Sequence, residues 1–176
     1  MIRGTYLMGN HTITGGFERE SLDIFNLFYQ HVDTEIRFDG IDNFEAGIAD
    51  RVDYGNAISN NELDAGVQWK YAVNTLYLQD AWQVNDRLNV TIGLRWEEYD
   101  SSDAPNENPE FVADYGFSNA ATLDGVDLLM PRFGFSYDAT DDITVRGGVG
   151  LFSGGNPNVW YSNVYSNTNT TAVQTD

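Results

Sequence analysis

The side chains that most often carry out chemistry are few in this chain and poorly spaced for it. The chain has no cysteine and only two histidines, His11 and His31, which lie 20 residues apart. Neither histidine has carboxylates at the spacing of a zinc site or a nucleophilic triad. Glu97 and Glu98 are adjacent, so on a strand they point to opposite faces and cannot act as a glycosidase pair. We therefore predict no enzyme activity, no cofactor and no metal site.

Two further segments lack the residues that a binding loop would need. The stretch GGVGLFSGG, residues 147–155, resembles a phosphate-binding loop but has no Gly-Lys-Ser/Thr ending. The segment 35–47 contains an Asp-Gly step, yet Arg37 stands where a calcium loop requires an acid. Neither segment predicts a nucleotide or calcium site.

Acidic residues gather in two parts of the chain. Of 27 Asp and Glu, 12 lie between residues 18 and 64, and 9 lie between residues 97 and 127. The net charge of −18 argues against a nucleic-acid partner, because phosphate binding requires clustered Lys and Arg.

Acidic stretches of this kind are usually solvated surfaces. The alternative is that their carboxylates take a divalent cation or meet a cationic ligand, with nearby aromatic residues adding contact surface. The candidate ligand-binding residues are Asp39, Asp42, Phe44, Glu45, Tyr54, Asp103, Glu107, Phe111 and Tyr115.

The elements that would position these loops are strands. Residues 88–96, LNVTIGLRW, place apolar side chains on one parity and polar or small ones on the other, as in a strand with two different faces. Residues 42–52 could form a short helix, and the Asn-rich tail from about 154 is predicted to be a loop. The predicted strands are about 2–8, 11–20, 68–84, 88–99, 131–138 and 143–153.

The lengths of the connections indicate what covers the apolar face. Short turns at 9–10, 85–87 and 139–142 alternate with long polar loops at about 21–67 and 100–130. In an up-and-down antiparallel sheet this order places every short turn at one end and every long loop at the other. Outer-membrane barrels are built this way, whereas a soluble β-sandwich has no reason to be.

Charge and aromatic residues follow the same pattern. Arg95 falls on the polar parity, where it would face water; on a lipid-facing position it would cost about 2–4 kcal/mol. Aromatic side chains stand near the ends of the apolar runs, as in the interfacial belts of membrane proteins. The predicted membrane-interface aromatics are Trp82, Trp96, Tyr99 and Tyr137.

The segment LYLQDAWQVNDRLNVTIGLRWEEYD, residues 76–100, resembles the barrel of TonB-dependent outer-membrane receptors. Those barrels repeat a Tyr-x-Gln-Asp-x-Trp strand, a short turn and a strand ending in Gly-Leu-Arg. Residues 10–20 and 22–28 are similar to another barrel strand of the group, and residues 122–138 and 145–168 are similar to its Oar-like subgroup.

The resemblance implies an all-β, antiparallel up-and-down meander of about six strands, forming part of a transmembrane β-barrel. It implies location in the outer membrane of a Gram-negative bacterium, contact with outer-membrane lipid, and import of an unknown ligand energised by TonB through a plug domain. Because such barrels have about 22 strands, we expect residues 1–176 to be an internal fragment without its plug and remaining strands. A soluble β-sandwich that binds a ligand or glycan is the alternative.

Overall fold

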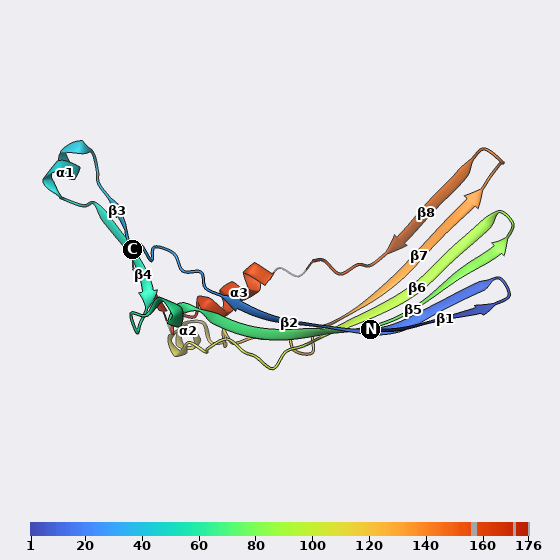
Figure 1. Ribbon diagram of the computed structural model, residues 1–176, viewed down its shortest axis with the longest axis horizontal. Helices are drawn as coiled ribbons and strands as arrows, with labels where there is room; N and C mark the ends of the chain where they lie inside the picture. Colours follow the sequence, from blue (N-terminus) through green and yellow to red (C-terminus); the bar gives the residue numbers. More distant parts are fainter. Residues whose placement is uncertain (156–157, 171, 176) are drawn as a thin grey trace. The chain divides into compact units, whose positions relative to one another are not determined.

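The computed structural model describes residues 1–155, 158–170 and 172–175. Its larger sheet contains six antiparallel strands, which lie side by side in the order in which they occur along the chain. The sheet order β1-β2-β5-β6-β7-β8 is the predicted up-and-down meander (Figure 1). The six strands are β1 Ile2–Met8, β2 His11–Asn26, β5 Val67–Asn85, β6 Leu88–Asp100, β7 Asp127–Asp138 and β8 Thr144–Gly150.

The strand register confirms the predicted division of side chains between two faces. Leu78 lies opposite Leu94, and Leu76 lies opposite Trp96, so these apolar residues share a face. Arg95 lies opposite Tyr77 in β5 and opposite Met130 in β7, on the other face. Since side chains alternate along a strand, the apolar series of β6 continues through Leu88, Val90, Ile92, Leu94 and Trp96.

The three short connections lie at the same end of the sheet, as predicted (Figure 1, right). Gly9 supplies the positive φ of 57° that the two-residue β1–β2 turn needs. In the β5–β6 turn, the Asn85 side chain accepts hydrogen bonds from the backbone N–H groups of Arg87 and Leu88. Local turn chemistry therefore fixes the register of each hairpin.

The chain divides into two units by its internal contacts. The first, which we call the sheet unit, contains Met1–Leu22, Tyr71–Ser102 and Leu123–Asn156. The second, which we call the loop unit, contains Asp23–Lys70, Asp103–Thr122 and Pro157–Asp176. The long loops predicted at 21–67 and 100–130 thus supply most of a separate folded unit.

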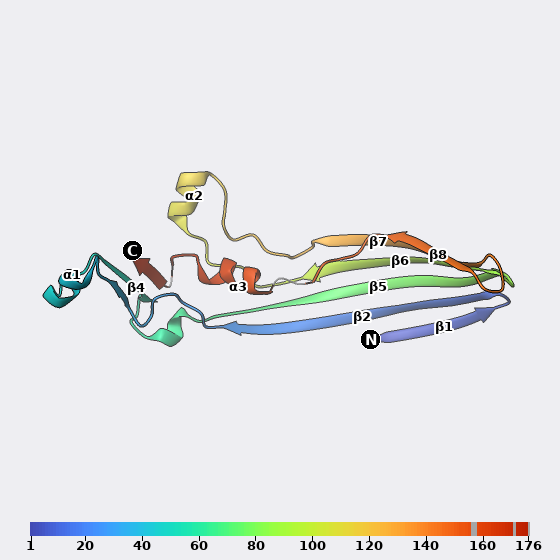
Figure 2. The same cartoon turned by 90° about the horizontal axis from the view of Figure 1, so that it is seen from above.

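The loop unit has regular structure that the sequence analysis missed. A three-stranded sheet pairs β4 Arg51–Ala57 with β3 Glu35–Arg37 on one side and with β9 Ala172–Thr175 on the other. The short helix suggested at 42–52 is present but earlier and shorter. The helical elements of this unit are α1 Ile41–Ala46, the 3-10 helix η1 Glu62–Ala65, α2 Pro109–Tyr115 and α3 Asn158–Ser166 (Figures 1 and 2).

The prediction of a loop after residue 154 is wrong for α3. Trp69, 1% exposed, stacks on Tyr165 of α3 with ring centroids 5.2 Å apart and an interplanar angle of 9°. Its indole N–H also donates a hydrogen bond of 3.2 Å to the Ser162 hydroxyl. These contacts offset the weak helix propensity of a segment rich in Asn and Ser. No helix among the described residues is long and apolar enough to cross a membrane.

Candidate functional site

The apolar face of the six-stranded sheet is exposed within the sheet unit. The exposed fractions of Leu78, Ile92 and Val149 are 60%, 54% and 74%. The same face is hollowed by an open groove of about 780 Å³, lined chiefly by apolar side chains. A continuous apolar surface of this kind marks a contact with lipid or with another protein.

The opposite face carries the polar groups of the sheet. The guanidinium of Arg95 lies 2.7 Å from a carboxylate oxygen of Glu97, and it also donates to the Thr75 hydroxyl. The side chain of Glu97 is 10% exposed and that of Arg95 is 30% exposed, so the pair remains partly open to solvent. Charged groups therefore occur on the face that a barrel turns toward its aqueous interior.

One polar pair lies on the apolar face, close to the short turns. His11 Nδ1 is 2.6 Å from Asp80 Oδ2, and the His11 ring stacks on Trp82 at 5.2 Å between centroids. Asp80 lies opposite Ile92 in the register, which places its carboxylate among apolar side chains. The pairing with His11 lowers the cost of a carboxylate there, since an unpaired charge next to hydrocarbon is strongly unfavourable.

The four predicted interfacial aromatics divide between the faces. Trp96 and Tyr137 share the apolar face with Trp82, and the Trp96 indole N–H lies 3.5 Å from Asp127 Oδ2. Tyr99 lies on the polar face with Arg95 and Glu97, where it stacks on Tyr71. Trp82, Trp96 and Tyr137 thus lie on the apolar face, and their interfacial role stays a prediction; Tyr99 lies on the opposite, polar face.

The candidate ligand-binding residues form separate groups within the loop unit. Asp39, Asp42, Phe44 and Glu45 belong to α1 and its N-terminal approach, and all four are exposed. Phe44 packs edge-on against Phe38. In Figures 1 and 2, α1 lies well apart from α2, so the structure does not gather the candidates into one site.

The second group surrounds α2, and its carboxylates already have partners. Asp103 accepts the Lys70 backbone N–H at 2.8 Å, while its carbonyl accepts the Tyr165 hydroxyl. Glu107 accepts the Ser118 hydroxyl at 2.6 Å.

Phe111 and Tyr115 form an aromatic cluster with Phe117, and Tyr115 remains 65% exposed. Tyr54 lies on β4, where its hydroxyl accepts a hydrogen bond from the Asn56 amide. The hydrogen bonds of Asp103 and Glu107 stabilise the loops, and a ligand-binding role for the aromatic groups stays a prediction.

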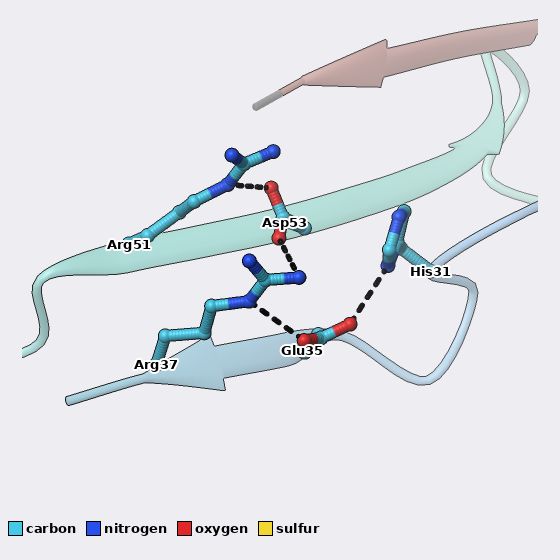
Figure 3. A network of polar contacts seen from close by, with 5 residues as sticks. All are labelled: His31, Glu35, Arg37, Arg51 and Asp53. Atoms are coloured by element: carbon cyan, nitrogen blue, oxygen red, sulfur yellow. Dashed lines mark hydrogen bonds and ion pairs between the residues drawn. The ribbon is translucent and has the colours of Figure 1, made fainter.

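A network of charged groups, which the sequence analysis did not predict, lies at the β3–β4 pairing (Figure 3). Ligand atoms of His31, Glu35 and Asp53 lie within 4.8 Å of one another, a spacing that could hold a metal ion. His31 Nδ1 is 3.4 Å from Glu35 Oε2. Glu35 and Asp53 are paired across the two strands, so residues 18 positions apart become neighbours.

Two arginines balance the charge of this network. Arg51 Nε donates to Asp53 Oδ1 at 2.6 Å, and Arg37 Nε donates to Glu35 Oε1 at 2.8 Å. Asp53 Oδ2 has no hydrogen-bond partner among the described residues and lies 3.8 Å from Arg37 Nη2. Because two guanidiniums face two carboxylates, the network is neutral without a cation, and it stabilises the hairpin.

Protonation of Asp53 should loosen this hairpin. The hydrogen bond from Arg51 lowers the pKa of Asp53 below its ordinary 3.8, so its ion pairs stabilise the fold fully above pH 3.8. That contribution is lost as the pH falls through the lowered pKa. We expect exchange protection of the β3 and β4 amides, corrected for intrinsic rates, to fall at the acid end of a pH 2–6 series.

The Asp53→Asn variant should remove this acid dependence and weaken protection at neutral pH, because it removes the carboxylate that pairs with Arg51 and lies 3.8 Å from Arg37, while Arg37 keeps its hydrogen bond to Glu35. Asp50→Asn is the matched control, since Asp50 is exposed on the same hairpin. An identical acid profile in Asp53→Asn and the unsubstituted chain would contradict this role of the network.

Comparison with known proteins agrees with the sheet geometry. The family described as outer membrane beta barrel domain matches residues 3–176, nearly the whole chain. Searches of curated proteins and of solved structures gave no match.

The family match, the up-and-down topology and the exposed apolar face assign the chain to the outer membrane of Gram-negative bacteria, with its sheet in lipid, and not to soluble β-sandwiches. The chain belongs to the outer membrane β-barrel domain family.

Proposed function

We propose that this barrel sheet belongs to a TonB-dependent receptor that captures a ligand with its long loops and imports it across the outer membrane. The observation that carries the proposal is the loop unit. The segments that connect β2 to β5 and β6 to β7 form strands and helices of their own and do not remain simple linkers. Folded loops on a rigid strand scaffold are the usual place for ligand recognition.

The strand motifs support the same receptor type. Tyr77, Gln79, Asp80 and Trp82 stand on β5 as in the receptors that this sequence resembles, and Arg95 follows on β6. In such receptors TonB acts through a plug domain, which we propose as a partner of the polar sheet face. The barrel binds and transports; we propose no catalytic role for it.

Import should depend on energy and on the loops. We expect cells that express the gene to take up one of three labelled probes, namely a maltooligosaccharide, ferric citrate or a short peptide. We expect a proton uncoupler to stop that uptake. Deletion of residues 103–122, which carry α2, should lower uptake at least tenfold because it removes part of the loop unit, including the Asp103 carbonyl that accepts the Tyr165 hydroxyl of α3.

The control for this deletion is the amount of surface-labelled protein, which should stay near that of the intact chain. Uptake that continues in the presence of the uncoupler would indicate a passive channel and would contradict TonB dependence. Uptake that survives the deletion would show that the α2 loop is only a solvated rim.

A further inference from the structure

The loop unit contains a cavity that lies outside the predicted acidic site. Its volume is about 290 Å³, close to the lower limit of about 300 Å³ for small-molecule sites. The lining comes from the segment after β2 and from α3 with the residues that follow it. The six lining residues are Phe28, Tyr29, Gln30, Asn163, Asn167 and Asn169.

The lining is uncharged although the chain as a whole is strongly acidic. Among the described residues, no carboxylate and no cationic side chain lines the cavity, whereas the chain carries 27 Asp and Glu. Four of the six lining side chains are amides, each offering two N–H donors and a carbonyl acceptor. Burial raises the pKa of Tyr29, so its hydroxyl stays protonated at neutral pH and can donate.

Two of these amides are available to a ligand. Among the described residues, the side chains of Asn163 and Asn169 make no hydrogen bond. The Asn167 amide oxygen accepts only a long bond of 3.4 Å from Ser166. Asn169 is exposed and Asn163 is half-buried, so a ligand can reach both amides.

One lining residue on each side of the cavity, Asn163 and Tyr29, is held in place by its surroundings, whereas Phe28 is 61% exposed. Asn163 lies on α3, which is held by the stacking of Trp69 on Tyr165 and by the Trp69–Ser162 hydrogen bond. On the other wall, Tyr29 packs against a cluster of buried alanines. Gly55 lies so close to Tyr29 that a Cβ there would be 3.0 Å from its ring, so the tyrosine has little room to move. A preformed site loses little entropy on binding.

We propose that this cavity binds one sugar ring of a neutral glycan. Each hydroxyl of a sugar is both donor and acceptor, and neighbouring hydroxyls can pair with the donor and acceptor of one amide. The rings of Phe28 and Tyr29 offer apolar surface for the C–H face of the sugar. A cationic ligand would find no carboxylate in the lining, and a phosphate would find no cation.

This inference rests on the proposed function, because it names the class of ligand that the proposed receptor binds. It places recognition at the cavity between residues 28–30 and 163–169, and not at the acidic side chains of α1 and α2.

The test is binding of monosaccharides to the whole chain folded in lauryldimethylamine oxide, a detergent without a sugar headgroup. Glucose, galactose, mannose and N-acetylglucosamine are titrated separately, and binding is followed by saturation-transfer NMR. We expect at least one sugar to bind saturably with a Kd of about 10 mM or tighter. We expect the strongest transfer to its ring C–H protons.

The substitution that tests the site is Asn163→Ala, which keeps or improves helix propensity and so leaves α3 folded. Loss of one or two hydrogen bonds should weaken binding about threefold to thirtyfold. The matched control is Asn106→Ala, because Asn106 is exposed in the same unit and does not line the cavity. This control should bind as the unsubstituted chain does.

Two results would overturn the proposal. One is that none of the four sugars binds saturably. The other is that Asn163→Ala binds as tightly as Asn106→Ala. Binding in detergent requires no transport. Sugar binding without uptake would therefore contradict only the proposed import, and uptake without sugar binding would contradict only this binding site.

Discussion

Ile92→Arg is expected to prevent assembly of the sheet in the outer membrane. Ile92 lies within the apolar series of β6, opposite Phe133 of β7, and its side chain is 54% exposed on the face assigned to lipid. An arginine near the middle of the hydrocarbon costs about 2–4 kcal/mol, which lowers the folded-to-unfolded ratio about 30-fold or more. The folded fraction is measured by heat-modifiable electrophoretic mobility of protein from isolated outer membranes.

The neighbouring residue provides the matched control. Thr91 lies opposite Gly134 on the polar face and is half-buried. Thr91→Arg should therefore assemble nearly as well as the unsubstituted chain, since its guanidinium would face water. Equal assembly of the two arginine variants would show that the two faces do not differ in their surroundings.

Trp69→Ala is expected to unfold the part of the loop unit built on α3. The indole is 1% exposed and contacts the rings of both Tyr161 and Tyr165. Removing a buried tryptophan costs about 3–5 kcal/mol, and α3 has little helix propensity of its own. Hydrogen exchange of the α3 amides should then approach the rate of an unstructured peptide.

Trp160→Ala is the control, because it separates the effect of losing the buried Trp69 from the effect of losing a tryptophan in general. Trp160 lies on α3 itself but is 75% exposed, so its removal should leave the exchange rates nearly unchanged. Sugar binding should be lost in Trp69→Ala and kept in Trp160→Ala. Slow exchange of α3 in both variants would mean that Trp69 does not hold this helix in place.

The strands could be predicted from the sequence because their signals are local. In β6 the alternation of Val90, Ile92 and Leu94 with smaller or polar residues reflects the two different faces of the strand. Asn85 marks the β5–β6 turn because its side chain accepts the backbone N–H groups of that turn. Connection lengths then determined the meander, since short turns force neighbouring strands to pair.

The loop unit could not be predicted in this way, because long-range contacts hold it together. β4 pairs with β9, more than 100 residues further along the chain, and no local pattern indicates that pairing. The Asn and Ser content of α3 predicted a loop, and packing against Trp69 reversed that preference. The cavity is lined by residues from 28–30 and 163–169, which are far apart in the sequence, so no local motif indicates it.

The arrangement of the predicted site residues could not be predicted from the sequence for the same reason, because it depends on long-range contacts. The number of acidic residues in and before α1 and α2 indicates a strong negative charge. It does not indicate how these residues are arranged in space. Structure shows that Glu107 and Asp103 hold their own loops together. It also brings His31 next to Glu35 and Asp53, a grouping that depends on strand pairing.

One face of the six-stranded sheet contacts lipid and the other faces water, and cysteine labelling tests this assignment directly. The chain has no cysteine, so single cysteines introduced at each position from 89 to 95 in β6 give an unambiguous readout. In intact outer membranes, a water-soluble maleimide should modify positions 89, 91, 93 and 95 and spare positions 90, 92 and 94. Uniform modification, or modification of the even positions alone, would contradict the assignment of the two faces.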